Sequence, residues 1–473
     1  MSAGLADLVH DAAVLHGFVD FLEEYCKEQE RSQTYIDASG LFFRYVERLA
    51  TGIKRELRNE VARAARLPAT RVPTRLPVIR RNLLTLKYYL RLLHSLIKPA
   101  ADAHTLTIPA PLIDLASQQL QRVEGMKNSK IVILLTPEFM YFQRPHTHIK
   151  EQARIVRTFI PQSTFPAKLG FIELPYSQGP SFFTNLALHH EIGHFVYEEL
   201  SNQNPPHPDI TALQTVTYRS LSKVFTDPQV FALVVKIIES WTQEIFCDLF
   251  ATRLLGPAFS FALVELLGML GFLSRKATVK FNPSHPASAF RFAEHVEMLR
   301  RDTWWDAIAD VNAEQKKLLE QLAKIPRSSY KFYVDDTELG PTSLVDTFLD
   351  SVVPVIRKLV VRITDKAKPI VKRFKDTRPE IEECLRVGVV PHTTNSRELD
   401  AVSIINASFA FYLTSLPDVI KVFDGVKARN NVEKHSEWTK RLESWTMKAI
   451  EDSQIQDRFR RNAKLWSFLK NKY

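Results

Sequence analysis

Apolar residues recur at helical spacing along most of this chain. Near the N-terminus, Leu15, Val19, Leu22 and Cys26 lie three or four positions apart, as the apolar face of a helix requires. A second broad apolar stripe runs over residues 82–97. Further helices are predicted over residues 182–200, 211–224, 228–255, 344–374 with a break near Pro369, 401–413 and 433–460. The pattern therefore predicts a mainly helical protein.

Prolines and β-branched runs interrupt this pattern in two places. Residues 67–81 hold three prolines within ten positions, which predicts either an extended connector or an elbow between two helices. The runs Ile131–Leu135 and Leu169–Leu174, each followed by a proline within two residues, are predicted strands. We therefore expect an α+β fold that is mainly α, with a small β-sheet.

The change from helical spacing to β-branched runs divides the chain into three expected regions. They are a helical N-terminal region over residues 1–125, a core over residues 126–300 and a helical C-terminal region over residues 301–473. A length of 473 residues allows two or three domains. Glycine occupies only 14 positions, well below the typical share of about 7%. A glycine content this low argues against a turn-rich β sandwich.

Cysteine usage and the first residues of the chain favour a cytoplasmic protein. Cys26, Cys247 and Cys384 lie far apart, so the sequence offers no cysteine zinc finger and no dense disulfide framework. The N-terminus lacks the basic and apolar regions of a signal peptide. Residues 254–273 carry one charge, Glu265. We expect a buried helix there, and no stable membrane span, because a charge at mid-bilayer is costly.

One predicted helix carries a pattern typical of zinc sites. Residues 190–194 read His-Glu-Ile-Gly-His, and two histidines four positions apart project from the same face of a helix. His190 and His194 are therefore candidate ligands of one Zn²⁺ ion. Glu191 could act as general base and acid on a water at the metal. The alternative is a pair of core histidines on an apolar helix face.

A second helix offers further candidates. A catalytic zinc normally takes three protein ligands and leaves one position open, and Glu244 is the natural third ligand. Asp248, one turn later, could accept the free ring N–H of a zinc-bound histidine and orient it. The alternative is a solvated acidic helix surface, which the neighbouring Phe246, Leu249 and Phe250 argue against.

Together these two helices resemble the gluzincin branch of zinc metallopeptidases. In that branch an HExxH helix is followed by a helix carrying ExxxD, whose glutamate completes the zinc site and whose aspartate supports it. The resemblance covers residues 169–291, about a quarter of the chain. The segment EIFCDLFATRLLGP is similar to ImmA/IrrE-type and to HtpX-type peptidases. The resemblance implies a zincin-like core, a zinc cofactor and a protein or peptide substrate.

Other residues near the motifs have alternative roles. His285, in a His-Pro pair, and Arg291 fit the pattern of HtpX-type peptidases. His285 could donate a hydrogen bond to a developing oxyanion or simply precede a helix, and Arg291 could brace the site or lie exposed. Residues 170–174 could form an edge strand that pairs with an extended peptide. Four neighbours are expected only to pack or to support the site: Tyr176, His189, Tyr197 and Cys247.

The net charge of +10 is unevenly distributed. Residues 51–100 hold 12 basic and 2 acidic side chains, residues 351–473 hold 24 and 15, and the rest of the chain is acidic. The basic flanking helices could therefore dock an acidic partner, with candidates among the arginines Arg63, Arg66, Arg71 and Arg75.

Three functions fit these observations. The leading hypothesis is a soluble zinc-dependent endopeptidase in which a zinc-activated water hydrolyses the peptide bond. The alternative is a non-catalytic helical interaction or nucleic-acid-binding protein on a zincin-like scaffold. Nucleic acid is the less expected partner, because the sequence has no zinc finger, RRM signature or glycine-rich phosphate loop. A membrane-associated peptidase is a third, weaker possibility. The oligomeric state is left open.

Overall fold

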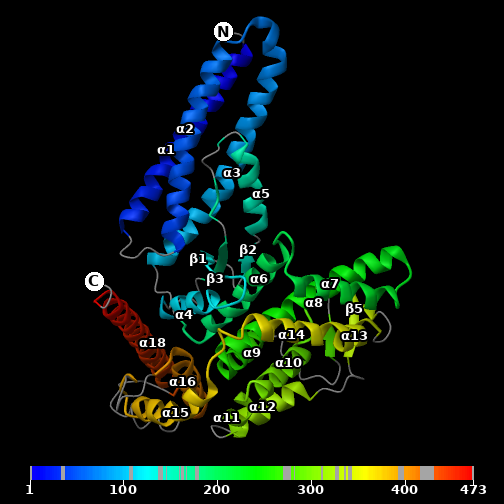
Figure 1. The fold of residues 1–473 in the computed structure, drawn as a ribbon, viewed down its shortest axis with the longest axis vertical. Helices are drawn as coiled ribbons and strands as arrows, with labels where there is room; N and C mark the ends of the chain where they lie inside the picture. Colours follow the sequence, from blue (N-terminus) through cyan, green and yellow to red (C-terminus); the bar gives the residue numbers. More distant parts are fainter. Residues whose placement is uncertain are drawn as a thin grey trace. The chain divides into compact units, whose positions relative to one another are not determined.

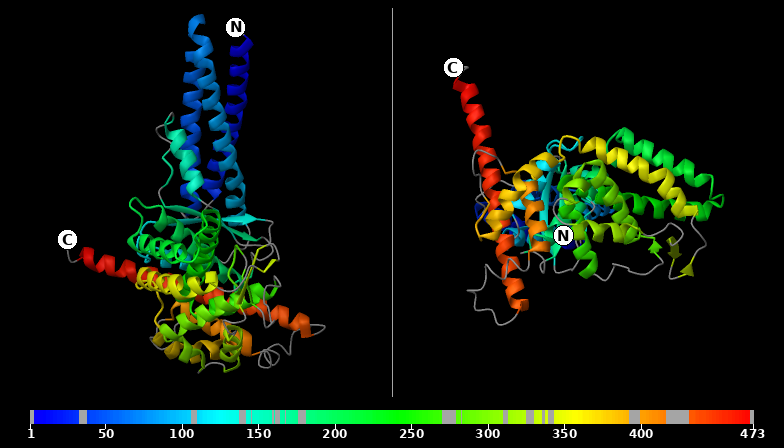
Figure 2. Two further views of the ribbon diagram at one scale, coloured as in Figure 1. Left: turned by 90° about the vertical axis from the view of Figure 1, so that its right-hand side faces the viewer. Right: turned by 90° about the horizontal axis from the view of Figure 1, so that it is seen from below.

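The protein is mainly helical and contains two small sheets, as Figures 1 and 2 show. The computed structural model describes residues 3–32, 38–105, 110–136, 142–144, 146–158, 160, 164–166, 168–175, 181–269, 279–281, 283–309, 313–324, 330–334, 337–338, 343–391, 399–415 and 431–470. The mainly α composition with a small sheet is the one that the sequence pattern predicts.

Two compact units make up the chain, and they alternate along the sequence. The first consists of Met1–Ile108 and Asn128–Gly179, and the second of Pro109–Lys127 and Pro180–Tyr473. The region predicted as one core, residues 126–300, is therefore shared between the units. Both strands predicted from the sequence belong to the first unit, whereas both helices of the zinc motif belong to the second.

Long helices dominate the first unit. Its elements are α1 (Ala3–Ser32), α2 (Ala38–Ala65), the 3₁₀ turn η1 (Ala69–Arg71), α3 (Val72–Thr105), β1 (Lys130–Thr136), β2 (Phe142–Arg144), α5 (His146–Arg157) and β3 (Leu169–Pro175). The apolar stripe predicted near the N-terminus is confirmed, because Leu15, Val19, Leu22 and Cys26 are all buried. The hydroxyls of Tyr45 and Tyr89 lie 2.6 Å apart within the same core.

The proline-rich segment between α2 and α3 forms an elbow, which confirms the second of the two alternatives. The chain turns at residues 66–68, and α3 then begins at Val72. Pro73 falls in the first turn of α3, where a helix leaves N–H groups without partners in any case. Pro77 and Pro99 lie further inside α3 and do not end it. The helix begins at Val72, ten residues before the apolar stripe over residues 82–97 from which it was predicted.

The sheet of the first unit confirms both predicted strands but corrects one expectation about them. Its strand order is β1-β3-β2, with β1 parallel and β2 antiparallel to β3. The prediction that residues 170–174 form an edge strand is therefore wrong, because β2 pairs with β3 from Phe171 to Glu173. A central strand has no free edge along those residues for a bound peptide. All seven residues of β3 are buried.

The second unit holds the remaining elements. They are α4 (Ala110–Leu120), the 3₁₀ turn η3 (Thr184–Ala187), α6 (Leu188–Ser201), α7 (Pro208–Ser222), α8 (Pro228–Leu255), α9 (Pro257–Met269), β4 (Val279–Phe281), α10 (Ser288–Arg301), α11 (Trp304–Ala309), α12 (Ala313–Ala323), β5 (Tyr330–Val334), β6 (Thr337–Glu338), α13 (Ser343–Thr347), the π-helical turn η5 (Phe348–Val352), α14 (Val353–Ile363), α15 (Val371–Arg386), α16 (Ala401–Thr414) and α18 (Asn431–Lys470). Strands β4, β5 and β6 form a second small sheet.

Helix α8 is the centre of the second unit. Its bounds follow from local chemistry, because Asp227 caps the first turn by accepting hydrogen bonds from the backbone N–H groups of Gln229 (2.8 Å) and Val230 (2.9 Å). Gly256 ends the helix with a φ of +69°, a conformation that favours glycine. From Glu244 onward every residue of α8 is buried, and α6, α7, α9, α10 and α14 pack around it.

The apolar stretch over residues 254–273 is not one continuous helix. Gly256 separates α8 from α9, and most of α9 from Pro257 to Leu267 is buried. Residues 270–273 lie outside the described residues. Across the part of the chain that the structure describes, no helix combines the length and the apolar character needed to cross a membrane.

Candidate metal centre

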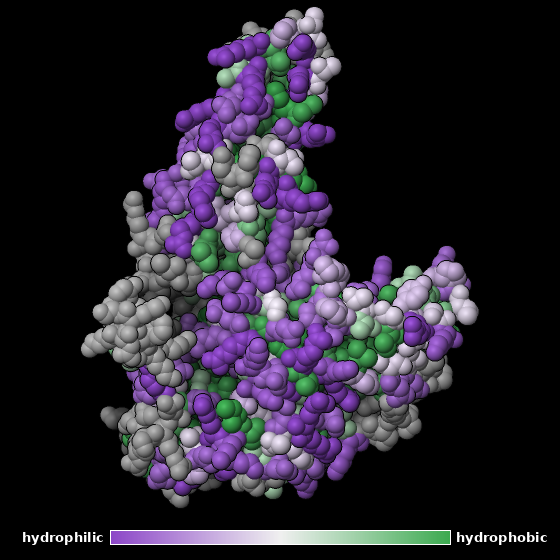
Figure 3. All heavy atoms as spheres, viewed as in Figure 1, coloured by the Kyte–Doolittle hydropathy of each residue, from purple (hydrophilic) through white to green (hydrophobic). Residues whose placement is uncertain are grey.

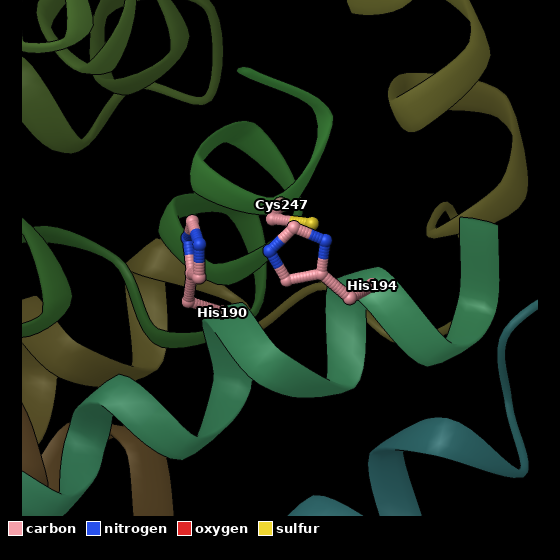
Figure 4. A group of neighbouring side chains, drawn as sticks. All are labelled: His190, His194 and Cys247. Carbon is pink, nitrogen blue, oxygen red and sulfur yellow. The ribbon is translucent and has the colours of Figure 1, made fainter. Parts of the chain in front are cut away.

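The two histidines of the motif project from one side of α6. Figure 4 shows both imidazole rings extending from α6 toward Cys247 of α8, and the ring centroids are 5.0 Å apart. The 3₁₀ turn η3 leads directly into α6, so His190 lies in the first turn of the helix, where the positive end of the helix dipole adds to the local field. The spacing of the motif therefore brings the two rings together as the sequence predicts.

Gly193 allows α6 and α8 to approach closely at this point. A Cβ atom at Gly193 would lie 2.7 Å from Cα of Cys247 and 3.1 Å from its Sγ. A carbon atom cannot approach backbone atoms that closely, and the backbone of α8 cannot turn away as a side chain can. The glycine of the HEIGH pattern is therefore required by the packing of the two helices that carry the candidate ligands.

Replacing Gly193 with alanine should destabilise the protein by about 1–3 kcal/mol, because α6 and α8 must move apart. Urea unfolding followed by the helical circular dichroism signal measures this change. Gly17→Ala is the matched control, since a Cβ atom there meets nothing within 4 Å, and it should stabilise α1 by up to about 1 kcal/mol. Equal stabilities for wild type and Gly193→Ala would contradict the close approach.

Glu244 faces both histidines of the motif. One oxygen of its carboxylate lies 3.5 Å from Nε2 of His190, and the other lies 3.5 Å from Nε2 of His194. Burial alone would raise the pKa of Glu244, but the two histidines and the charge of Arg291 outweigh it and hold the pKa well below its ordinary value. The carboxylate is therefore negatively charged between two imidazole rings.

Asp248 contacts His190 on the side of the ring that points away from Glu244. Its Oδ1 lies 2.9 Å from Nδ1 of His190, and Arg291 donates to both of its oxygens at 2.6 and 2.7 Å. Burial alone would raise the pKa of Asp248, but Arg291 and His190 outweigh it and hold the pKa well below its usual range. Burial alone would likewise lower the pKa of His190, whereas hydrogen bonds with Asp248 and Glu244 raise it to about 10.

The sequence did not point to His295, which completes this network. It lies one turn after Arg291 on α10 and is fully buried. Its Nε2 is 3.6 Å from Oδ2 of Asp248, and its Nδ1 lies 3.1 Å from the hydroxyl of Ser260. The i,i+4 spacing of Arg291 and His295 was the only sequence signal for it, and it becomes meaningful once Asp248 is known to face α10.

His285 lies at the exposed side of the same group. Its Nε2 is 3.7 Å from a carboxylate oxygen of Glu244, and its side chain is 55% exposed. Its Nδ1 lies 2.9 Å from the hydroxyl of Ser284, whose backbone carbonyl accepts a hydrogen bond from Ser240 of α8 at 2.7 Å. The loop that carries His285 is therefore fastened to the helix that carries Glu244, and about half of the His285 side chain is exposed to solvent.

Cys247 lies next to the two motif histidines, a position that the sequence does not predict. Ligand atoms of His190, His194 and Cys247 all lie within 4.8 Å of one another, so this buried group could hold a metal ion. The sequence signal was the three-residue spacing from Glu244, which places both on one face of α8. Burial raises the pKa of the Cys247 thiol well above its ordinary value, and the charges of Glu244 and Glu191 raise it further.

The remaining neighbours do not join the group. His189 is fully buried and turns to α4, where its Nε2 lies 2.9 Å from the amide oxygen of Gln119. Burial lowers the pKa of His189 to about 3, so it is neutral. Tyr197 packs against Phe246 with ring centroids 5.3 Å apart. Tyr176 lies outside the described residues.

Fold and geometry together define a mainly helical protein with a buried His-His-Cys group that could hold a metal ion. Comparison with known proteins finds no matching family model, no matching curated protein and no matching solved structure.

Proposed function

We propose that the protein is a zinc-dependent endopeptidase. The observation that carries the proposal is the position of Glu244, whose two oxygens each lie 3.5 Å from Nε2 of one motif histidine. Ligand atoms held about 2.0–2.1 Å from zinc at tetrahedral angles lie about 3.4 Å from one another. Each of these two distances between Glu244 and a histidine therefore suits a pair of ligands on one zinc ion.

Glu244 fits the third ligand position better than Cys247 does. Its carboxylate contacts both imidazoles, and Arg291 lies 3.5 Å from the oxygen that faces His190. The sulfur of Cys247 instead packs against α6 at Gly193, where it fills the contact between the two helices. Two imidazoles and one carboxylate form the donor set of a catalytic zinc site, which keeps its fourth position open.

The supporting residues fix the orientation of this donor set. Asp248 accepts from the ring edge of His190 that points away from Glu244, so Nε2 is directed toward the proposed ion. Arg291 pairs with Asp248 and also approaches Glu244, so its one positive charge offsets part of the negative charge of two buried carboxylates. Such supporting contacts typically account for 10–100-fold in metal affinity.

Two residues of the chain would then have separate roles in peptide hydrolysis. When bound, zinc supplies a Lewis acid that makes water acidic enough to lose a proton near neutral pH. The Glu191 carboxylate takes that proton and returns it to the leaving nitrogen of the substrate. His285, half-exposed beside Glu244, is placed to donate a hydrogen bond to the oxygen of the scissile carbonyl as it gains charge.

The choice of third ligand leads to a direct prediction about metal content. Glu244→Gln should lower zinc affinity by at least about 100-fold, more than a supporting residue costs, because it removes a negatively charged donor. Cys247→Ser, the matched change three residues later, should leave zinc affinity within a few-fold of wild type. Mass spectrometry of the metal and titration against a competing chelator measure both. The reverse result would assign the site to Cys247.

Peptide hydrolysis tests the proposed activity itself. Incubation with a library of peptides from a digested proteome should produce new termini that mass spectrometry detects. A chelator should abolish their formation, and added zinc should restore it. Protein that carries about one zinc ion per chain yet cleaves nothing in this library would contradict the peptidase and leave a non-catalytic metal site.

A further inference from the structure

The first unit exposes large apolar side chains on two of its long helices. Val14 and Phe21 of α1 are 56% and 53% exposed, and Leu84 and Tyr88 of α3 are 66% and 51% exposed. Figure 3 shows hydrophobic side chains between hydrophilic ones on the surface that these long helices form. Single exposed apolar residues are common, but a contiguous group indicates an interaction surface.

Two contacts give the register of α1 against α3. Arg80 donates to Asp7 at 3.3 Å, and the rings of Phe21 and His94 have centroids 6.3 Å apart. Both pairs are 73 positions apart, so the two helices run parallel and each residue of α1 lies level with the residue 73 positions later in α3. The two helices therefore pack side by side without a shift over this length.

This register brings the exposed apolar residues together. Leu84 and Tyr88 follow Arg80 by four and eight positions, so they lie about 40° and about 80° around α3 from Arg80, next to the side that contacts α1. Val14 precedes Phe21 by seven positions and lies on the same side of α1. In this register Val14 is level with Lys87, the residue before Tyr88. We call this surface the α1–α3 face.

Gly17 lies in the middle of this face. It is four positions from Phe21 and three from Val14, it is exposed, and a Cβ atom on it would meet nothing within 4 Å. A glycine inside a helix costs about 1 kcal/mol relative to alanine. The described structure gives no packing reason for this cost, whereas a helix docked on the α1–α3 face could approach the bare backbone at this position.

Cations border the face along α3. This helix carries six basic side chains and one acidic one, Asp102. Arg81, Lys87 and Arg91 are exposed and lie within four positions of Leu84 or Tyr88. Within the part of the chain that the structure describes, none of these three forms an ion pair. Their charges are therefore available to a partner.

We propose that the α1–α3 face binds an acidic amphipathic helix of a partner protein. The apolar stripe of that helix covers Val14, Phe21, Leu84 and Tyr88, and its carboxylates pair with the cations along α3. Apolar anchors of this kind bind a protein helix and contribute nothing to a phosphate backbone.

A displayed peptide library tests this proposal with the full-length protein. Every peptide has apolar residues at helical i, i+3/i+4, i+7 spacing, and the flanking positions are acidic, neutral or basic in three separate pools. Selection should enrich the acidic pool. The affinities of enriched peptides, made synthetically and measured by fluorescence anisotropy, should fall steeply with added salt.

Two variants locate the binding surface. The triple reversal R81E/K87E/R91E should weaken binding of an enriched peptide at least tenfold. The control R219E/K223E/K236E makes an equal charge change at exposed positions in α7, directly after α7 and in α8, and it should alter binding less than twofold. Gly17→Leu should weaken it roughly fivefold by blocking close approach. Circular dichroism confirms that each variant folds.

Several outcomes would overturn the proposal. They are enrichment of the neutral or basic pool, no enrichment at all, and acidic peptides whose affinity is the same for R81E/K87E/R91E and for its control. A duplex or single-stranded oligonucleotide that binds more tightly than every enriched peptide, and is lost in the same triple variant, would assign the face to nucleic acid. Concentration-dependent dimers in sedimentation, abolished by Gly17→Leu, would assign it to a second copy of the chain.

Discussion

Replacing Glu191 with glutamine should lower the rate of peptide cleavage by about 10²–10⁴-fold while zinc content is unchanged. Glutamine has the same shape and volume as glutamate but cannot take a proton from water, and general base catalysis by a positioned carboxylate contributes a factor of that size. Glu191 is buried beside His190 on α6, so a neutral replacement of equal volume should not disturb the packing of α6 on α8.

The measurement compares initial rates on one peptide found in the library digest, together with zinc stoichiometry. Glu198→Gln makes the same change two turns further along α6 and should leave the rate within about twofold of wild type. Wild-type cleavage by the Glu191→Gln protein would remove Glu191 as the base. Loss of zinc together with the rate would place Glu191 among the groups that hold the ion instead.

Removing the Asp248 carboxylate should have the second large effect. Asp248→Ala leaves the buried Arg291 guanidinium without its carboxylate, which typically destabilises a protein by about 3–5 kcal/mol. It also removes the hydrogen-bond partner of His190, so zinc affinity should fall about 10–100-fold. Urea unfolding of the metal-free protein and chelator titration measure the two effects separately.

Two control variants separate the two expected effects of Asp248→Ala, the loss of stability and the loss of zinc affinity through His190. Asp302→Ala breaks the ion pair with the buried Arg253 near the end of α8 (2.8 Å), and it should lower stability without changing zinc affinity. The double variant D248L/R291M replaces the buried charges by apolar groups and should recover much of the stability but none of the zinc affinity. Recovery of both would show that Asp248 serves only to compensate Arg291.

The sequence predicted α8 to the residue, because its limits depend on local chemistry, whereas the helix predicted over residues 182–200 begins six residues later, as α6 (Leu188–Ser201). Residues 228–255 were predicted as one helix, and α8 spans Pro228–Leu255 since Asp227 caps its start and Gly256 ends it. The two histidines of α6 face one another for a similarly local reason, the 3.6-residue period of the helix.

Features that depend on contacts between distant segments were not available from the sequence. Residues 170–174 looked like an edge strand because nothing local shows that β2 pairs with them. His295 and Cys247 could not be assigned to the site, because their positions depend on how α10 and α6 pack against α8. Spacing predicts which residues share a face, but the neighbour that this face meets is a property of the whole unit.

The alternation of the two units along the chain sets the order in which a newly made protein can complete them. The first unit has all its segments once residue 179 has been translated. Helix α4 is made before that point, yet its partners come later: Gln119 donates to the carbonyl of Leu254, and Gln454 donates to the carbonyl of Pro111. A ribosome must therefore add more than 300 residues after Pro111 before α4 meets Gln454 of α18. A fragment that starts at residue 180 would lack this helix, and a chain truncated before α18 would leave one side of it uncovered.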